Sequence, residues 1–301
     1  MNPLSFDGRV VIVTGAGGGL GRAHALEFAR RGAKVVVNDI GAPLREEGSS
    51  VGPAQAVVEE IVAADGEAVA NTDSVADAEG GEAIVQTALD AFGRIDVIVN
   101  NAGILRDKSF HNMDAAMVGA VIAVHLEGAF NVTRPAWTHF REQNYGRVLS
   151  TASNAGLFGN FGQANYGAAK LGLVGLTHVL ALEGAKYNIK ANALAPIATT
   201  RMTEELFGDD IKELFDPAKV SPIAAYLCHE DCEVTGEVYS VGGGRVARAF
   251  VGLTKGVVLD EITAEAMAEN LEAIRDTTDF ETYGSAFEEV AAVAERLGKG
   301  G

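Results

Sequence analysis

Short apolar stretches alternate along the chain with longer stretches rich in Ala, Leu and Glu. The longer stretches carry apolar residues at helical spacing, whereas residues 35–37 and 97–99 are apolar at consecutive positions. A strand that is apolar on both faces is typical of a parallel sheet covered by helices on each side. The pattern predicts strands at residues 9–13, 34–38, 68–70, 95–100, 147–150, 189–194 and 238–241.

This alternation favours an α/β fold. Right-handed βαβ crossovers make a Rossmann-like, doubly wound parallel sheet flanked by helices the simplest topology. No repeat or linker divides the first 245 residues, so we expect residues 1–245 to form one dinucleotide-binding catalytic domain. Residues 246–301 read as a helical C-terminal extension of the same domain, with helices at 264–276 and 283–297. Residues 40–53 form a long polar loop that either lines a site or is an insertion.

The charge of the chain argues against a nucleic-acid partner. Lys and Arg number 24 and Asp and Glu number 41, which gives a formal net charge of -17 at pH 7 and repels a phosphate backbone. No uninterrupted apolar run approaches the roughly 20 residues that cross a bilayer, and residues 1–7 lack a secretory signal pattern. We therefore expect neither nucleic-acid binding nor membrane insertion.

The cysteines and the last residues bear on location and metal binding. Cys228 and Cys232 are too few for a disulfide framework and fit a reducing compartment. The final Gly-Lys-Gly-Gly is not a peroxisomal targeting signal, so a cytoplasmic protein is expected. His229 lies between the cysteines, but three ligands without a second cluster fall short of a structural zinc site, and we expect no metal.

A glycine-rich motif follows the first predicted strand. Residues 14–21 read Thr-Gly-Ala-Gly-Gly-Gly-Leu-Gly, and a helical stretch comes next. In a dinucleotide site Gly15 permits the tight turn, Gly19 lets the backbone approach a pyrophosphate at the helix N-terminus, and Gly21 lets helix and strand pack closely. Leu20 belongs to the same motif and is grouped with the cofactor-binding residues. By itself the motif also fits an ordinary glycine-rich turn.

Asp39 closes the second predicted strand, eighteen residues after Gly21. An acidic side chain at this spacing accepts hydrogen bonds from an adenosine ribose. A carboxylate about 5 Å from a ribose 2′-phosphate would be repelled by about 3 kcal/mol per unit charge at an effective dielectric of about 20. No Lys or Arg lies within residues 14–21 to compensate, so NAD is the expected cofactor. The alternative for Asp39 is an ordinary cap at a strand end.

Ser153, Tyr166 and Lys170 form a candidate catalytic set. Tyr166 and Lys170 are four residues apart on one helix face, and Ser153 follows a strand. A phenol that acts near neutrality needs a pKa roughly 2–3 below its usual value near 10, which one ammonium about 4 Å away can supply. Ser153 can hydrogen-bond the substrate oxygen. Each residue alone also fits a structural role, as a packed ring, a solvated charge or a cap.

Together these residues resemble the signature of the short-chain dehydrogenase/reductase family. The matching segments are residues 14–21, the Asn-Asn-Ala-Gly of residues 100–103, and the Ser, Tyr and Lys set, within residues 5–245. The resemblance implies homodimers or homotetramers and roles near the cofactor for further residues. These are sheet support by Asn101, Ala102 and Gly103, adenine contact by Asp73, and nicotinamide-ribose binding by Tyr166 and Lys170.

A closer resemblance concerns the substrate. Residues 36–39, 100–110, 159–166 and 227–230 are similar to the (3R)-hydroxyacyl-CoA dehydrogenase domains of peroxisomal multifunctional enzymes type 2. Those domains use NAD to oxidise (3R)-hydroxyacyl-CoA to 3-oxoacyl-CoA, and some relatives oxidise the 17β-hydroxyl of steroids. The resemblance implies the same acyl-CoA oxidation here, with Tyr166 as general base.

The chain departs from the broader family at two places. His125 stands where the family usually has an Asn that holds a proton-relay water, so His125 either replaces it, shuttles a proton itself, or is a hydrogen-bonded core histidine. Residues 196–197 read Pro-Ile where the family has Pro-Gly, which weakens the carry-over of a cofactor role to residues 197–202. Arg106 and Lys108 either counter the phosphates of CoA or are surface charges.

Three other functions stay open at this point. A 17β-hydroxysteroid dehydrogenase would use the same catalytic residues on another substrate. A non-catalytic NAD-sensing or scaffold protein would share the fold, although a binding protein needs no activated phenol. A reductase that uses NADPH is a third possibility, against which Asp39 argues.

Overall fold

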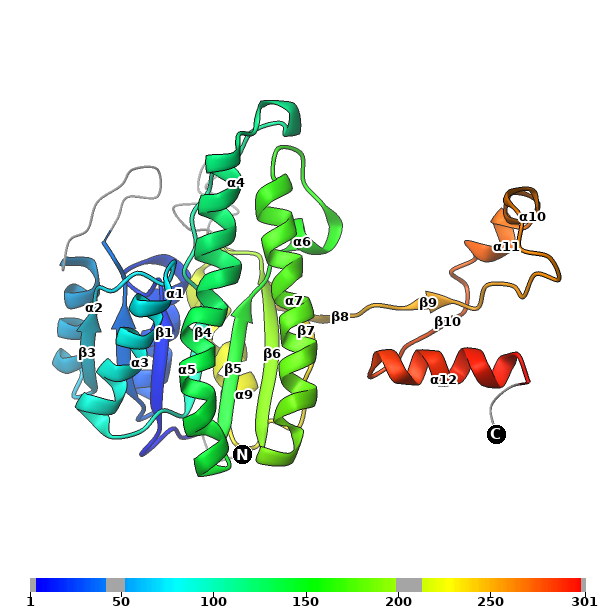
Figure 1. Ribbon diagram of the computed structural model, residues 1–301. Helices are drawn as coiled ribbons and strands as arrows, with labels where there is room; N and C mark the ends of the chain where they lie inside the picture. Colours follow the sequence, from blue (N-terminus) through cyan, green and yellow to red (C-terminus); the bar gives the residue numbers. More distant parts are fainter. Residues whose placement is uncertain (1–3, 42–51, 199–212, 299–301) are drawn as a thin grey trace. The chain divides into compact units, whose positions relative to one another are not determined.

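The computed structural model describes residues 4–41, 52–198 and 213–298. Its main feature is an eight-stranded sheet with the strand order β3-β2-β1-β4-β5-β6-β7-β8 (Figure 1). Every pairing from β3 to β7 is parallel, which confirms the predicted Rossmann-like, doubly wound sheet. The strands are β1 Val10–Thr14, β2 Lys34–Asn38, β3 Glu67–Asn71, β4 Val97–Asn100, β5 Gly146–Thr151, β6 Ile189–Pro196, β7 Val238–Gly242 and β8 Arg245–Ala249.

The seven predicted strands are all present, with ends that differ from the predicted ones by two residues or fewer. The eighth strand, β8, follows β7 after two residues and was not predicted, because its sequence Arg-Val-Ala-Arg-Ala has only short apolar side chains between charges. Of the predicted loop at residues 40–53, residues 42–51 lie outside the described part of the chain.

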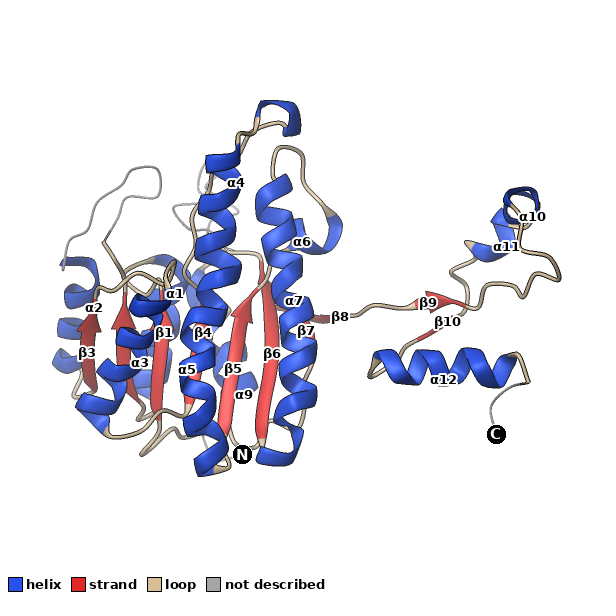
Figure 2. Ribbon diagram, in the orientation of Figure 1, coloured by secondary structure: helices blue, strands red, loops and turns tan. Residues whose placement is uncertain are grey.

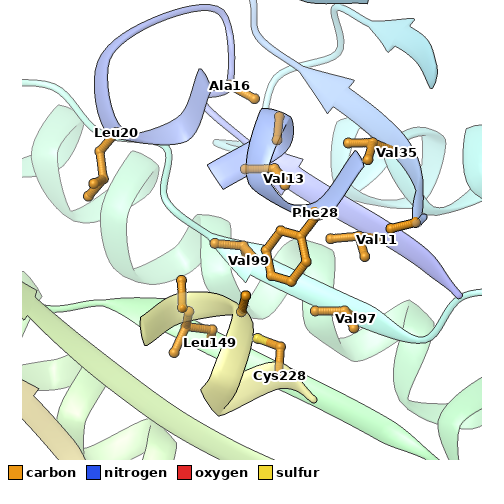
Figure 3. Packing of buried hydrophobic residues seen from close by; sticks show 14 of the residues in the cluster. Val11, Val13, Ala16, Leu20, Phe28, Val35, Val97, Val99, Leu149 and Cys228 are labelled. Carbon is orange, nitrogen blue, oxygen red and sulfur yellow. The ribbon is translucent and has the colours of Figure 1, made fainter. Parts of the chain in front are cut away.

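Helices cover both faces of the sheet. The helices of the first unit are α1 Gly19–Arg30, α2 Gly52–Ala63, α3 Ala78–Phe92, α4 Ala115–Ile122, α5 Gly128–Gln143, α6 Asn154–Phe158, α7 Ala164–Gly184 and α9 Ser221–Cys228. One core cluster joins α1, α2 and α9 to one face, with Phe28 and Cys228 packed around Val11 and Val99 (Figure 3). A second cluster joins α3 and α5 to the other face.

The alternation of side chains along the strands explains the continuous apolar runs. Val11 and Val13 belong to the first cluster, whereas Val10 and Ile12 belong to the second. Successive side chains of a strand point to opposite faces, so both sets are buried only if both faces are covered. The helices on the two faces of the sheet therefore bury all four residues.

Two helical stretches are long and apolar enough to cross a membrane by length and composition, Ala115–Gln143 and Ala164–Tyr187. The first comprises α4, α5 and the turn between them, and the second comprises α7 and a short 3-10 turn. Core helices of water-soluble proteins often meet the same criterion, and both stretches carry buried polar side chains, Thr133 and Lys170 among them. We interpret both as core helices, and the absence of membrane insertion stays a prediction.

The contacts divide the chain into two compact units, Met1–Arg248 and Ala249–Gly301. The second unit contains α10 Ala264–Glu269, α11 Leu271–Ile274, α12 Ala286–Arg296 and the antiparallel pair β9 Leu253–Thr254 and β10 Phe280–Glu281. The helix predicted at residues 264–276 is broken at Asn270, and the one predicted at 283–297 starts later because Ser285 caps it. The assignment of residues 246–301 to the same domain as residues 1–245 stays a prediction.

Candidate active site

The predicted site residues lie at one edge of the sheet. The arrowheads of β3 and β5 point to a common edge in Figure 2, and the parallel pairing brings the carboxyl ends of β1, β4 and β5 together at that edge. The glycine loop follows β1, Asp39 follows β2, residues 101–103 follow β4 and Ser153 follows β5. In open α/β sheets this edge is where ligands bind.

The glycine loop between β1 and α1 depends on the absence of side chains. Gly15 and Gly19 have φ angles of 62° and 49°, which favour glycine. A Cβ atom at Gly15 would lie 2.7 Å from the Cα of Ala102, and one at Gly21 would overlap the carbonyl oxygen of Gly15. The N-cap residue of α1, Gly18, has no side chain to cap the helix. The loop and the helix N-terminus therefore fit an anionic pyrophosphate.

Replacing Gly21 by Ala should disrupt this cradle. The added methyl group would overlap Gly15 and lie 2.5 Å from Nδ2 of Asn101. Overpacking of this kind costs about 1–3 kcal/mol, so we expect a lower melting temperature and at least a tenfold weaker affinity for NADH by fluorescence titration. Gly119→Ala in α4 is the matched control, since its Cβ would meet nothing within 4 Å. An unchanged NADH affinity in Gly21→Ala would contradict the assignment.

The Asp39 carboxylate lies against the glycine loop. Its Oδ2 accepts a hydrogen bond from the backbone N–H of Gly17 at 2.9 Å, and its Oδ1 accepts one from the N–H of Gly41 at 2.8 Å. These bonds fix the carboxylate at the end of β2, beside the start of α1. The structure thus brings Asp39 and the glycine loop together.

Asp73 is held in an amide network beside β2 and β3. Its Oδ2 accepts a hydrogen bond from Nδ2 of Asn71 at 2.7 Å, and its backbone carbonyl accepts one from Nδ2 of Asn38 at 2.9 Å. Asn38 also donates to Oδ1 of Asn71 at 2.8 Å. The backbone after β3 is thereby fixed, and the contact of Asp73 with adenine stays a prediction.

Residues 101–103 connect the end of β4 to the start of the glycine loop. The backbone N–H groups of Asn101 and Ala102 both donate to Oγ1 of Thr14, at 3.0 and 3.1 Å. The side-chain Nδ2 of Asn101 donates to the carbonyl oxygens of Thr14 and Gly15. Gly103 packs directly against the ring of His125. The loop after β4 thus forms a wall beside the glycine loop.

Ser153, Tyr166 and Lys170 come from two neighbouring segments. Ser153 is the N-cap of α6, where its Oγ accepts a hydrogen bond from the N–H of Ala155 at 3.1 Å. Tyr166 lies in the first turn of α7, close enough to Ser153 for that side chain to lower the pKa of its phenol. Lys170 is one turn later, 3% exposed, and its Nζ donates to the carbonyl of Thr151 at 2.5 Å. Catalytic and capping roles for Ser153 are therefore compatible.

The electrostatics of this set differ from the expectation that an ammonium lowers the pKa of the phenol. Burial raises the pKa of Tyr166, and the hydrogen bond from Ser153 opposes this only in part. Burial also lowers the pKa of Lys170 to about 7. Its Nζ lies 5.5 Å from the centre of the Tyr166 ring. In the protein alone, burial therefore favours the neutral phenol.

Lys170 should consequently destabilise the fold at low and neutral pH. Because its pKa is lowered from 10.5 to about 7, the unfolded chain binds more protons than the folded one between these values, and stability rises with pH across that interval. Below pH 7 the full cost remains, roughly 5 kcal/mol at about 1.4 kcal/mol per pKa unit. We expect Lys170→Met to raise the free energy of unfolding by about 2–3 kcal/mol at pH 6, after loss of one hydrogen bond.

Urea unfolding at several pH values tests this prediction. The difference between Lys170→Met and the wild type should be largest at pH 7 and below and should shrink toward pH 10. Lys186→Met, at an exposed lysine just beyond α7, should leave the unfolding curve nearly unchanged. A destabilised Lys170→Met at pH 6 would show that the charge of Lys170 is compensated in the fold.

His125 lies in a π-helical turn, η2 Ala123–Glu127, between α4 and α5. Its Nε2 is 3.0 Å from the backbone nitrogen and 2.8 Å from the carbonyl oxygen of Ile104. Its ring meets the ring of Tyr166 edge to face, with centroids 5.1 Å apart. Burial and the charge of Lys170 hold the pKa of His125 well below its usual range. A neutral, fixed ring favours a positioning role over proton transfer by the imidazole.

Some residues at this site were not predicted. Asn165 precedes Tyr166, is buried, and donates from Nδ2 to the carbonyls of Arg106 and Met117 at 3.1 and 3.3 Å. Its Oδ1 accepts from the N–H of Tyr166 at 2.8 Å. A polar side chain next to Tyr166 on a largely apolar helix was the available signal. The sequence carries no such signal for Thr151, because this residue acts through its backbone carbonyl.

Other predicted residues lie at the edge of the site or away from it. Lys108 is exposed, and its backbone N–H donates to the carbonyl of Gly162 at 3.0 Å, so its contact with CoA stays a prediction. Ile197 pairs with β7 through the carbonyl of Val241, whereas residues 199–202 of the predicted loop lie outside the described part of the chain. His229 lies near the start of β5, where its carbonyl accepts from Arg147 at 3.2 Å.

Cys228 and Cys232 are both buried and free. Burial raises the pKa of both Cys228 and Cys232, which opposes the thiolate form that a metal requires. Nε2 of His229 is 2.9 Å from the carbonyl of Ser5. Within residues 4–41, 52–198 and 213–298, no group of three or more His, Cys, Asp or Glu side chains is arranged to hold a metal ion.

Comparison with known proteins identifies the family. The family described as short chain dehydrogenase matches residues 9–210. This chain belongs to the short-chain dehydrogenase family. The short-chain dehydrogenase is therefore an oxidoreductase that acts on the CH–OH groups of small-molecule substrates, with NAD or NADP as the family's cofactor.

Three relatives show how far the similarity extends. Mouse peroxisomal multifunctional enzyme type 2 is 49% identical over 302 residues, which cover 99% of this chain and 41% of that protein. A hydroxyacyl-CoA dehydrogenase of Mycobacterium tuberculosis is 39% identical over 263 residues, covering 81% of this chain and 80% of that protein. The structure of full-length Drosophila melanogaster multifunctional enzyme type 2 matches with a TM-score of 0.83 and 38% identity, covering 98% of this chain and 50% of that one. This short-chain dehydrogenase thus spans less than half of the mouse relative.

Proposed function

We propose that this protein oxidises (3R)-hydroxyacyl-CoA to 3-oxoacyl-CoA with NAD. The observation that carries the proposal is the meeting of the Ser153–Tyr166 pair and buried Lys170 at the sheet edge that also holds the glycine loop and Asp39. The substrate class is supported by the hydroxyacyl-CoA dehydrogenase among the relatives. The role of the catalytic residues in this chain is part of the proposal.

The chain's own groups supply acid–base chemistry. Tyr166, as phenolate, takes the proton of the substrate hydroxyl, and Ser153 donates a hydrogen bond to the same oxygen as charge develops on it. Lys170, held by the carbonyl of Thr151, supplies positive charge beside Tyr166 and binds the nicotinamide ribose. When bound, the nicotinamide accepts the hydride from the substrate carbon. His125 keeps the Tyr166 ring in place from the side.

The preference for NAD over NADP is assigned to Asp39. Its carboxylate is fixed by Gly17 and Gly41 at the end of β2, where the family's adenosine ribose would lie. At about 5 Å a second negative charge costs about 3 kcal/mol, which corresponds to more than a hundredfold in affinity. Arg22, the nearest cation after the glycine loop, is paired with Glu60 at 2.6 Å. Asp39 would thus repel a 2′-phosphate, and Arg22 would not compensate for this repulsion because it is paired with Glu60.

Initial rates of NADH formation test substrate, stereochemistry and cofactor together. The purified protein is offered (3R)-hydroxyacyl-CoA, (3S)-hydroxyacyl-CoA and a 17β-hydroxysteroid, each with NAD and with NADP. We expect turnover with the (3R) thioester and NAD. Activity on the steroid alone would replace the substrate and retain the catalytic residues. Silence with all three would favour a non-catalytic, NAD-sensing protein.

We further propose a homodimer or homotetramer of cytoplasmic location. Leu171 and Leu182 of α7 are 49% and 56% exposed, an apolar surface of the kind that subunit contacts cover. Light scattering of the purified protein should give two or four times the mass of 31.3 kDa. A monomer at micromolar concentration would contradict the proposal.

A further inference from the structure

A small cavity lies between the end of β4 and the π-helical turn η2. Thr14, Asn100, His125 and Gly128 are among the residues that line it. Its volume, measured as the space open to the centre of a water molecule, is about 10 Å³. A single water molecule needs about 10–15 Å³ of such space. The cavity therefore has room for one water molecule and for no larger ligand.

Two polar atoms on residues that line this cavity lack partners in the part of the chain that the structure describes. They are Oδ1 of Asn100 and Nδ1 of His125, and both atoms are buried. Asn100 is 6% exposed and His125 is 3% exposed. The other polar atoms of the two side chains are bonded, Nδ2 of Asn100 to Oγ1 of Thr133 at 3.0 Å and Nε2 of His125 to Ile104. Buried polar atoms are almost always satisfied by protein or by ordered water.

We propose that the cavity binds one water molecule, which bridges Oδ1 of Asn100 and Nδ1 of His125. A buried water needs two to four polar partners, and these atoms provide two. The bridge would join β4 to the π-helical turn, two elements that 22 residues separate in the chain. His125 would then be fixed at both ring nitrogens.

The water can bridge the two atoms with either neutral form of His125, and that form decides whether Nε2 pairs with the carbonyl or with the N–H of Ile104. If Nε2 carries the proton, it donates to the carbonyl of Ile104, and the water donates one O–H to Nδ1 and the other to Asn100. If Nδ1 carries the proton, it donates to the water, which still donates to Asn100, and Nε2 accepts from the N–H of Ile104. Burial favours a neutral ring by lowering the pKa of His125. No charged form is needed in either arrangement.

The bridge makes His125 a positioning residue for Tyr166. The His125 ring packs against Gly103 on one side and meets the Tyr166 ring edge to face at 5.1 Å. A ring held at both nitrogens cannot turn about its bond to Cβ, so the Tyr166 ring keeps one orientation toward Ser153. This consequence rests on the proposed function, in which Tyr166 is the base, whereas the water site itself does not.

A crystal structure of the wild-type protein that shows ordered water tests the site directly. We expect one peak within hydrogen-bonding distance of both Oδ1 of Asn100 and Nδ1 of His125. A cavity without a peak, or a water bonded to only one of the two atoms, would overturn the proposal. This readout does not depend on substrate, so it separates failure of the water site from failure of the proposed function.

Two variants separate the bridge from general effects at Asn100. Asn100→Leu removes both bonds of this side chain, whereas Thr133→Val removes only the partner of its Nδ2. We expect the nitrogen NMR resonance of His125 Nδ1 to move in Asn100→Leu and to stay in Thr133→Val. Loss of one ordinary hydrogen bond predicts about a tenfold fall in kcat in Asn100→Leu, with little change in KM for NAD. Equal His125 spectra in the wild type and Asn100→Leu would overturn the bridge, and if Asn100→Leu does not fold, the wild-type water peak decides.

Discussion

Tyr166→Phe is expected to lower kcat for alcohol oxidation about a thousandfold, within the roughly 10²–10⁴ that a general acid or base contributes. The substitution removes the hydroxyl whose pKa Ser153 lowers and leaves the ring that packs against His125. The fold and the glycine loop should therefore persist. We expect the dissociation constant of NADH to change by less than about tenfold, since a single neutral hydrogen bond is the most that is lost. Steady-state kinetics and NADH fluorescence measure the two quantities.

Tyr187→Phe is the matched control for loss of a phenol hydroxyl. Tyr187 lies just beyond α7, where its oxygen accepts a hydrogen bond from Arg141 at 2.8 Å. Tyr187 is 21 residues from Tyr166 in the chain. We therefore expect the kcat of Tyr187→Phe to equal that of the wild type. A Tyr166→Phe enzyme that kept a tenth or more of the wild-type kcat would show that another group removes the substrate proton.

Asp39→Asn is expected to reduce the preference for NAD over NADP about a hundredfold, because it removes a repulsion of about 3 kcal/mol at 5 Å. The amide has nearly the same shape, and its oxygen can still accept one of the two hydrogen bonds from Gly17 and Gly41. The other N–H would face an amide NH₂ group, which should weaken NAD binding as well. The ratio of kcat/KM for the two cofactors, measured with one alcohol, gives the effect.

Asp90→Asn is the control for the change in net charge. Asp90 is exposed on α3, where it accepts a hydrogen bond from Gln86 at 2.7 Å. Asp90→Asn removes the same formal charge from the protein without contact with the glycine loop. Its ratio of kcat/KM for the two cofactors should therefore equal that of the wild type. An equal change in both variants would assign the NAD preference to the overall negative charge of the chain, and no change in Asp39→Asn would remove Asp39 from cofactor selection.

Burial acts on the catalytic pair in a way that favours the neutral form of each group. It raises the pKa of Tyr166 and lowers that of Lys170 to about 7. Near neutral pH, Lys170 is therefore only partly protonated, and its help to the phenolate is weaker than a full charge would give. We expect the rate of alcohol oxidation to rise with pH, since the phenolate is the reactive form.

The strands and their two-sided burial could be predicted because they depend on short stretches of sequence. Consecutive β-branched residues at 35–37 and 97–99 indicated strands buried on both faces, and the two core clusters confirm this. The order of Gly15, Gly19 and Gly21 after a strand likewise depends on local backbone requirements. Once the strands are parallel, their carboxyl ends must meet, so the sequence also predicted which candidate residues lie near each other.

Only the tertiary structure decided the state of those residues. The π-helical turn around His125, the cavity that it shares with Asn100, and the low pKa of Lys170 arise from contacts between segments far apart in the chain. The break at Asn270 and the strand β8 also follow from no local pattern that we identified. Periodicity and spacing describe what a segment can form. Burial and ionisation depend on all the groups that surround a side chain, and the fold alone brings those groups together.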